Sequence, residues 1–126
     1  MRFETIGNAT LIVYEDNKPL ICSDVWFHDY PAYFGSWSLS HKVPPAQKEA
    51  IINSKYIFIS HFHPDHLNLN TLKHCKNATL ILAPHYGSRV ETELRNMGFR
   101  VITFPSRKWI QIGNFTRLIL FWTTNF

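Results

Sequence analysis

The sequence predicts a single α/β domain, and three observations support this prediction. The chain has 126 residues, of which 45% are apolar, which is enough for one hydrophobic core. Strand-like and helix-like segments alternate between residues 55 and 104, as is typical of parallel βαβ units. Before them, three strand-like runs are separated by short polar turns, which indicates an antiparallel meander.

The meander consists of the runs RFETI, ATLIVY and LICSD, joined by Gly7-Asn8 and by the polar turn EDNKP. Residues 26–45 are rich in aromatic residues, Gly, Ser and Pro and have no regular periodicity, so we expect a long ordered loop there. Loops of this kind often carry function. Pro44-Pro45 then opens a short helix that reaches about Asn53.

The second part of the chain predicts the strands KYIFIS, ATLILA and FRVITF, with a short helix in each interval. Asn70 is the expected cap of the first helix, within TLKHCK. Ser88 and Glu91 have the spacing of a capping box for the second, which Gly98 ends. The runs KWIQI and FTRLILFW, joined at Gly113-Asn114, predict a final hairpin.

Composition limits the classes of function. The net charge of +4 comes from scattered residues without a basic block, so the sequence indicates a weak preference for anionic partners and does not favour nucleic-acid binding. The N-terminus lacks the apolar segment of a signal peptide, and no window is long enough to cross a membrane. A soluble, cytoplasmic protein is the resulting prediction.

The two cysteines are the only thiols of the chain. Cys22 and Cys75 are far apart in sequence and form no C-x-x-C pair, so the sequence predicts neither a disulfide framework nor a cysteine-rich metal site. Cys/His pairs of the Rieske type are also missing, so an oxygenase reaction by this chain alone lacks support. We expect both thiols to fill the core.

The stretch SHFHPDH carries the strongest chemical signal, because it places His61, His63, Asp65 and His66 directly after a predicted strand. On an extended segment, His61 and His63 project to the same side and can bind one ion. The turn after Pro64 can bring Asp65 and His66 toward a second ion. Imidazole and carboxylate together suit zinc best here, with manganese or iron as alternatives, as one or two divalent ions. The competing interpretation is a solvated histidine-rich loop.

These residues also carry a family resemblance. SHFHPDH resembles the H-x-H-x-D-H signature of the metallo-β-lactamase superfamily, and the upstream meander ending in Asp24 resembles its opening segment. Residues 33–72 are most similar to the branch of L-ascorbate-6-phosphate lactonase-like and CMP-N-acetylneuraminate hydroxylase-like proteins. The resemblance implies an αββα sandwich, of which residues 1–126 would form one domain covering about the N-terminal half, truncated at the C-terminus.

The resemblance also implies roles for individual residues. His61 and His63 would bind the first metal, Asp65 and His66 the second, and Asp24 would orient a ligand histidine. Asp65 would be catalytic, because it would also position the metal-activated water. His85 and Trp37 are candidates to face the substrate, although a surface position and core packing are the simpler interpretations.

The function that follows is a metal-dependent hydrolase acting on an ester, lactone or phosphoester of a small sugar-derived or phosphorylated substrate. Two alternatives remain open. One is a truncated, inactive metal-binding remnant. The other is the metal-binding domain of a sugar-nucleotide hydroxylase system whose redox centre lies elsewhere. If the sheet has lost its covering layer, we also expect self-association through the uncovered sheet face.

Overall fold

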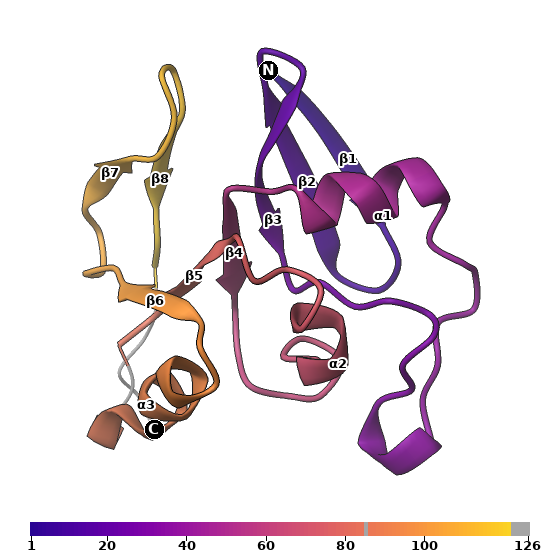
Figure 1. The fold of residues 1–126 in the computed structure, drawn as a ribbon. Coiled ribbons are helices and arrows are strands. Elements are labelled where there is room, and N and C mark those ends of the chain that lie inside the picture. The colour runs from indigo at the N-terminus through magenta and orange to yellow at the C-terminus, as the bar shows by residue number, and fades with distance from the viewer. Residues whose placement is uncertain (85, 122–126) are drawn as a thin grey trace.

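The computed structural model describes residues 1–84 and 86–121 (Figure 1). Six strands form one mixed sheet in the order β1-β2-β3-β4-β5-β6, and β7-β8 form a separate two-stranded sheet. The first three strands, β1 (Arg2–Ile6), β2 (Thr10–Glu15) and β3 (Lys18–Ser23), pair antiparallel. The predicted meander is therefore confirmed.

The next three strands are parallel to β3 and to one another. They are β4 (Tyr56–Ile59), β5 (Thr79–Leu82) and β6 (Arg100–Thr103). The helices α1 (Pro45–Ile52), α2 (Leu69–Leu72) and α3 (Arg89–Asn96) lie in the connections. This confirms the predicted βαβ units, since parallel neighbours require a crossover connection.

The two faces of the large sheet belong to two different apolar clusters. Ile12, Ile57 and Leu80 contribute to the main core, which also contains buried residues of all three α-helices, among them Ile51, Leu72 and Leu94. Their neighbours in sequence point to the opposite face because side chains alternate along a strand. There Val13, Ile21 and Ile81 join a smaller cluster with residues flanking the hairpin of β7 (Trp109–Gln111) and β8 (Arg117–Ile119).

The predicted αββα sandwich is therefore wrong for this chain. Strands predominate in the described residues, and the α-helices are only eight, four and eight residues long. Helical residues enter the core on one face of the large sheet, whereas the other face meets a hairpin. The alternation of segments predicted parallel strands correctly, but it contains no information about which layer lies on the second face.

Two predicted helix caps are also wrong. Asn68 rather than Asn70 caps α2, because its Oδ1 accepts a hydrogen bond of 2.9 Å from the Thr71 amide. Ser88 precedes α3 with a left-handed backbone (φ 50°) and makes no side-chain capping bond, so the capping box does not form. The predicted stop at Gly98 is confirmed by its φ of 89° and by a bond from the Phe99 amide to the Leu94 carbonyl.

Within the described residues, no helix combines the length and apolar character needed to cross a membrane.

Candidate functional site

The candidate site lies where β3 and β4 end. These strands are parallel neighbours, so their carboxyl ends share one edge of the sheet, where loops commonly carry functional residues. Asp24 follows β3 and Ser60 follows β4. The Asp24 amide donates to the Phe58 carbonyl at 2.9 Å, and Asp24 Oδ1 accepts from the Ser60 amide at 2.8 Å. Asp24 is thus fixed at both its backbone and its side chain.

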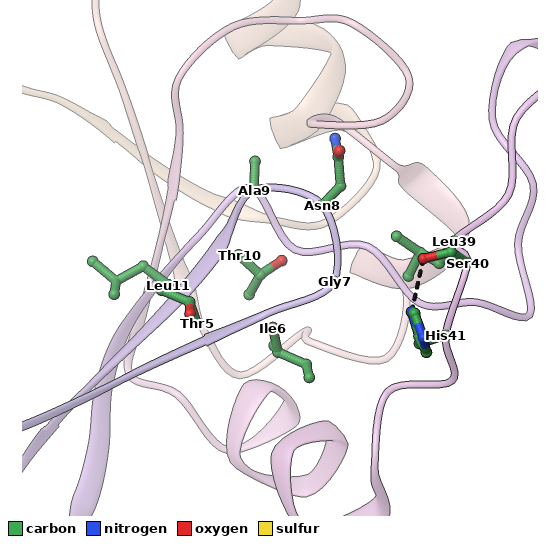
Figure 2. Close-up of a pocket in the computed structure, with 10 residues that line it drawn as sticks. All are labelled: Thr5, Ile6, Gly7, Asn8, Ala9, Thr10, Leu11, Leu39, Ser40 and His41. Carbon is green, nitrogen blue, oxygen red and sulfur yellow. Dashed lines mark hydrogen bonds between the residues drawn. The ribbon is translucent and has the colours of Figure 1, made fainter.

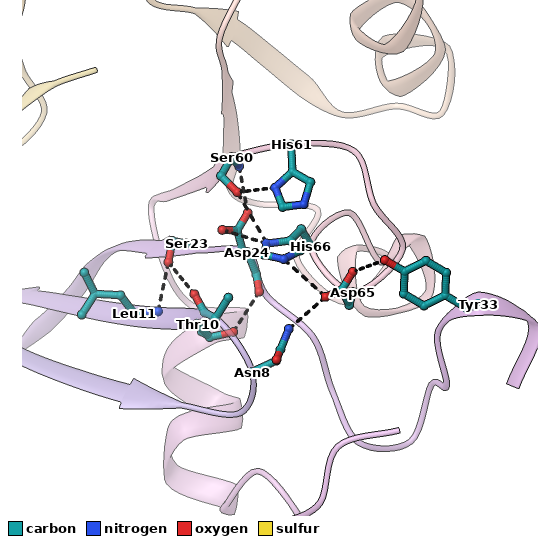
Figure 3. Close-up of polar contacts among 11 residues, drawn as sticks. Asn8, Thr10, Leu11, Ser23, Asp24, Tyr33, Ser60, His61, Asp65 and His66 are labelled. Atoms are coloured by element: carbon teal, nitrogen blue, oxygen red, sulfur yellow. Dashed lines mark hydrogen bonds and ion pairs between the residues drawn. The ribbon is translucent and has the colours of Figure 1, made fainter. Parts of the chain in front are cut away.

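A chain of carboxylate and imidazole groups crosses this edge (Figure 3). His66 Nδ1 lies 3.2 Å from Asp24 Oδ2, and His66 Nε2 lies 3.3 Å from Asp65 Oδ2. Asp24 and Asp65 are both buried, with 6% and 5% of their surface exposed. An imidazole held between two carboxylates can accept a proton at one ring nitrogen and release one from the other, so this arrangement is suited to proton transfer.

Asp65 has two further partners from distant parts of the chain. Asn8 Nδ2 donates to Oδ2 at 3.0 Å, and the Tyr33 hydroxyl donates to Oδ1 at 2.8 Å. Burial alone raises the pKa of Asp65, but the hydrogen bonds from Tyr33 and Asn8 and the nearby His66 outweigh it and lower the pKa below its ordinary value. Hydrogen bonding to Asp65, together with burial, raises the pKa of Tyr33.

His61 and His63 lie beside the Asp24, His66 and Asp65 side chains, and both are exposed. Their ring centroids are 4.7 Å apart, and the ring centroid of His61 lies 3.9 Å from that of His66. Ser60 Oγ is 2.9 Å from His61 Nδ1, which orients the ring. Desolvation, followed by the neighbouring His66 and His63, lowers the pKa of His61 and favours its neutral form.

The predicted metal ligands are therefore near one another, but they are not arranged around one point. In the part of the chain that the structure describes, no group of three His, Cys, Asp or Glu side chains could hold an ion. The reason is visible in the hydrogen bonds: both ring nitrogens of His66 face carboxylates, and both Asp65 oxygens have partners. The ligand role of His61, His63, Asp65 and His66 stays a prediction.

Of the other three predicted site residues, two lie in the described part of the chain, and they differ in their distance from the His/Asp cluster. Asp24 contacts His66, and its expected role of orienting a metal-ligand histidine stays a prediction. Trp37 is 54% exposed and contacts Tyr33, with ring centroids 5.0 Å apart. His85 lies outside the described residues.

Sequence reasoning missed the contacts of Asn8 and Tyr33 with Asp65. Asn8 lies 57 positions from Asp65 and Tyr33 lies 32 positions from it. Tyr33 belongs to the aromatic loop, in which no periodicity marks one ring as different from the others. The unusual backbone of that loop, with positive φ at both Tyr33 and Phe34, could not be predicted from residue types that normally avoid it.

Comparison with known proteins identifies several relatives. Proteins of Mycobacterium tuberculosis and Mycolicibacterium smegmatis, whose names describe them as Rieske 2Fe-2S iron-sulfur proteins, are each 27% identical over 101 residues. These residues are 79% of this chain and 19% of the relatives. The cytidine monophosphate-N-acetylneuraminic acid hydroxylase of Asterias rubens is 27% identical over 107 residues, 80% of this chain and 16% of that protein. No protein-family model matches the chain.

The chain thus spans less than a fifth of the length of these relatives. Their names describe iron–sulfur proteins and a hydroxylase, not hydrolases. The metallo-β-lactamase assignment, the hydrolase function and the zinc or other divalent-ion cofactor are therefore wrong. The physical reason for the error is that a short run of histidine and aspartate specifies donor atoms, and several chemistries use the same donors.

The cofactor to which the relatives point is a 2Fe-2S cluster, and a Rieske centre needs two cysteine thiolates and two histidines. Cys22 and Cys75 are both in the main core, where burial raises the pKa of each thiol to about 12. Cys22 Sγ lies 2.8 Å from Ser54 Oγ, and Cys75 Sγ donates to the Thr71 carbonyl at 3.7 Å. The cysteines of this chain do not fit the cluster, because both are protonated core residues.

Proposed function

We propose that this chain is a component of a Rieske-type hydroxylase system and that it contributes the His/Asp site rather than the iron–sulfur cluster. The observation that supports this most strongly is the similarity, over about four-fifths of the chain, both to proteins named for a Rieske cluster and to a named hydroxylase. Because the two buried thiols do not suit a cluster, the 2Fe-2S centre would be carried by another segment or subunit.

The geometry favours the hydroxylase component over a simple electron carrier. Hydroxylation by dioxygen consumes protons as well as electrons, and the Asp24–His66–Asp65 chain can hold and transfer protons. Within this row of three side chains, Asp65 would be the catalytic residue, since hydrogen bonds from Asn8 and from Tyr33 of the aromatic loop fix the orientation of its carboxylate. The role of Asp24 would be to position His66.

The substrate proposed for the system is a sugar-derived, phosphorylated small molecule. The relative from Asterias rubens is named for such a compound, a cytidine monophosphate sugar. The scattered net charge of +4 is compatible with an anionic substrate. We also propose a reducing, cytoplasmic location, because both cysteines are free thiols.

The proposed function is tested by purifying the tagged chain from its own cells under anaerobic conditions. We expect it to copurify with a protein that gives the electron paramagnetic resonance signal of a reduced, histidine-coordinated 2Fe-2S cluster. The purified material should hydroxylate CMP-N-acetylneuraminate in the presence of dioxygen and a reductant. Recovery of the chain without an iron–sulfur protein, or material without hydroxylase activity, would contradict the proposal.

A matched pair of variants tests the role of Asp65. Asp65→Asn keeps the shape of the side chain and removes the carboxylate, so hydroxylation by the purified complex should fall by roughly 100-fold, the lower end of a general acid–base contribution. Asp29→Asn is the control, because Asp29 is exposed and pairs with Lys48 at 2.9 Å rather than with Asp24, His66 or Asp65. Equal activity of the two variants would remove Asp65 from the reaction.

A further inference from the structure

A pocket lies beside the candidate site, between the turn that joins β1 to β2 and the loop segment 39–41 (Figure 2). Its volume is about 480 Å³, within the range of small-molecule sites. Residues 7–9 of the turn form one wall, and residues 39–41 form another. Because the two walls come from separate parts of the chain, the pocket exists only in the folded protein.

The lining combines apolar surface with groups that form hydrogen bonds. Ile6 and Leu39 supply apolar surface, and Thr5 and Ser40 supply hydroxyl groups. Ser40 Oγ is 2.8 Å from Nδ1 of His41, which orients the imidazole and leaves its Nε2 for another partner. This combination suits a ring compound that has one apolar face and several hydroxyl groups.

The lining of the pocket carries no negative charge that would repel an anion. The residues that line the pocket include the His41 imidazole and no carboxylate. Lys42 follows His41 directly in the chain. A negatively charged group would therefore enter the pocket without repulsion from its walls, and Nε2 of His41 could donate a charge-assisted hydrogen bond to it.

Asn8 connects the pocket to the candidate site. It belongs to the pocket wall, and its Nδ2 donates to Asp65 Oδ2 at 3.0 Å. A ligand that contacts Asn8 is therefore one side chain away from the Asp65–His66–Asp24 chain (Figure 3). Movement of the Asn8 amide would change a hydrogen bond that holds Asp65 in place.

We propose that this pocket binds a hydroxylated, anionic sugar and that Asn8 transmits its binding to Asp65. The inference rests on the proposed function, whose substrate class it specifies. Unlike the proposed function, it can be tested on this chain alone, because binding in the pocket needs no partner protein.

The experiment is a titration of the isotope-labelled full chain with CMP-N-acetylneuraminate, with N-acetylneuraminate and with the neutral N-acetylmannosamine, followed by two-dimensional NMR. We expect the amide signals of Gly7, Asn8, Ser40 and His41 to shift with both anionic compounds. The neutral sugar should bind roughly tenfold more weakly, because it lacks the charge-assisted hydrogen bond.

The Ser40→Ala/His41→Ala double variant removes the polar wall at exposed positions, so it should fold normally and bind the anionic compounds at least roughly tenfold more weakly. Ser106→Ala is the control, since it lies beyond β6, at the opposite edge of the sheet from β1. Unchanged affinity in the double variant, or shifts confined to other residues, would overturn the pocket assignment. Equal affinity for the neutral sugar would overturn the anionic class.

The connection through Asn8 has its own readout. In the wild-type chain, ligand binding should shift the ring signals of His66. In Asn8→Ala this shift should be lost even at ligand concentrations that saturate the pocket, as judged from the Ser40 and His41 amide signals. A His66 shift of the same size in Asn8→Ala would overturn the connection. Because these are binding measurements on the chain alone, they can fail while the copurification and hydroxylation tests succeed, and the reverse also holds.

Discussion

Asp24 is the residue on which the candidate site depends most. Its backbone adopts a left-handed conformation with φ of 43°, which Asp tolerates better than most residues. Its carboxylate accepts a hydrogen bond from the Ser60 amide and faces His66. One side chain therefore connects the ends of two neighbouring strands with the histidine loop.

Replacing Asp24 with Asn should destabilise the fold by about 1–3 kcal/mol, because the buried, neutral amide loses the charge-assisted hydrogen bond to the Ser60 amide and the carboxylate contact with His66. The free energy of unfolding in urea measures this effect. Asp16→Asn is the matched control, since Asp16 also has a left-handed backbone (φ 51°) but is exposed. Similar losses in the two variants would show that backbone conformation, rather than the buried contacts, is what matters at position 24.

The cysteines provide a second test at the residue scale. Burial raises the pKa of Cys22 and Cys75 to about 12, so both should remain protonated at neutral pH and react slowly with a thiol reagent in the folded chain. Unfolding should restore ordinary reactivity. We further expect iron and sulfide reconstitution to give the same low 2Fe-2S absorbance in wild type and in Cys22→Ala/Cys75→Ala. A strong cluster spectrum that disappears in the double variant would contradict our interpretation of the core.

At the scale of elements, a carboxylate of the large sheet holds the turn of the β7–β8 hairpin, in addition to the apolar contacts between them. Glu15, the last residue of β2, accepts hydrogen bonds from the amides of Asn114 and Phe115 at 2.8 and 2.7 Å, and from the Thr116 hydroxyl at 2.8 Å. A Cβ at Gly113 would lie 2.5 Å from this carboxylate, so Gly permits the close approach. The hairpin turn is therefore shaped around Glu15.

These contacts predict how stability depends on pH. Desolvation raises the pKa of Glu15, but the hydrogen bonds from Phe115, Asn114 and Thr116 outweigh it, and the pKa falls below its ordinary value of 4.5. A carboxyl whose pKa is lower in the folded state stabilises the fold above its unfolded pKa. That stabilisation is lost as the pH falls through the folded pKa.

We therefore expect Glu15→Gln to unfold at a lower temperature than wild type at pH 7. The difference should shrink below the ordinary pKa of 4.5 and disappear as the pH falls through the lower pKa of the folded state. Thermal unfolding across this pH range measures the difference. Glu93→Gln on the exposed surface of α3 is the control and should show little change at any pH. A pH-independent difference for Glu15→Gln would mean that the carboxylate charge is not what holds the hairpin.

At the scale of the whole molecule, the two faces of the sheet are covered to different extents. The helix-side core contains many fully buried residues, whereas the hairpin side keeps Phe58, Ile102 and Leu118 only partly buried. Leu11, Phe58 and Leu118 also line a small apolar cleft of about 110 Å³. On the hairpin itself, Trp109 and Phe115 are 65% and 77% exposed.

We expect the chain to self-associate through this hairpin side, since exposed apolar surface of this kind favours association. Trp109→Ser/Phe115→Ser should shift the sedimentation equilibrium toward the monomer. Phe34→Ser is the control, because Phe34 is fully exposed but belongs to the aromatic loop, far from the hairpin in sequence. A wild-type chain that sediments as a monomer at all concentrations would contradict the prediction.

The sequence by itself determined most of the local structure. Alternation of apolar residues identified the strands, and Gly98 identified the end of α3, because these signals act within a few residues of the chain. The close grouping of His61, His63, Asp65 and His66 was also predictable, since neighbours in sequence cannot separate far. Asp24 faces His66 because a parallel strand pair brings strand ends to one edge, and its role of orienting a ligand histidine stays a prediction.

Only the tertiary structure decided the contacts between distant segments. It placed Asn8 and Tyr33 against Asp65, Glu15 against the hairpin turn, and the 39–41 segment across from the β1–β2 turn. It also decided that the second face of the sheet meets a hairpin and that the histidine loop engages carboxylates through hydrogen bonds. The physical reason is that such contacts depend on how layers pack and on which polar groups must find partners when buried, and neither is encoded in local spacing.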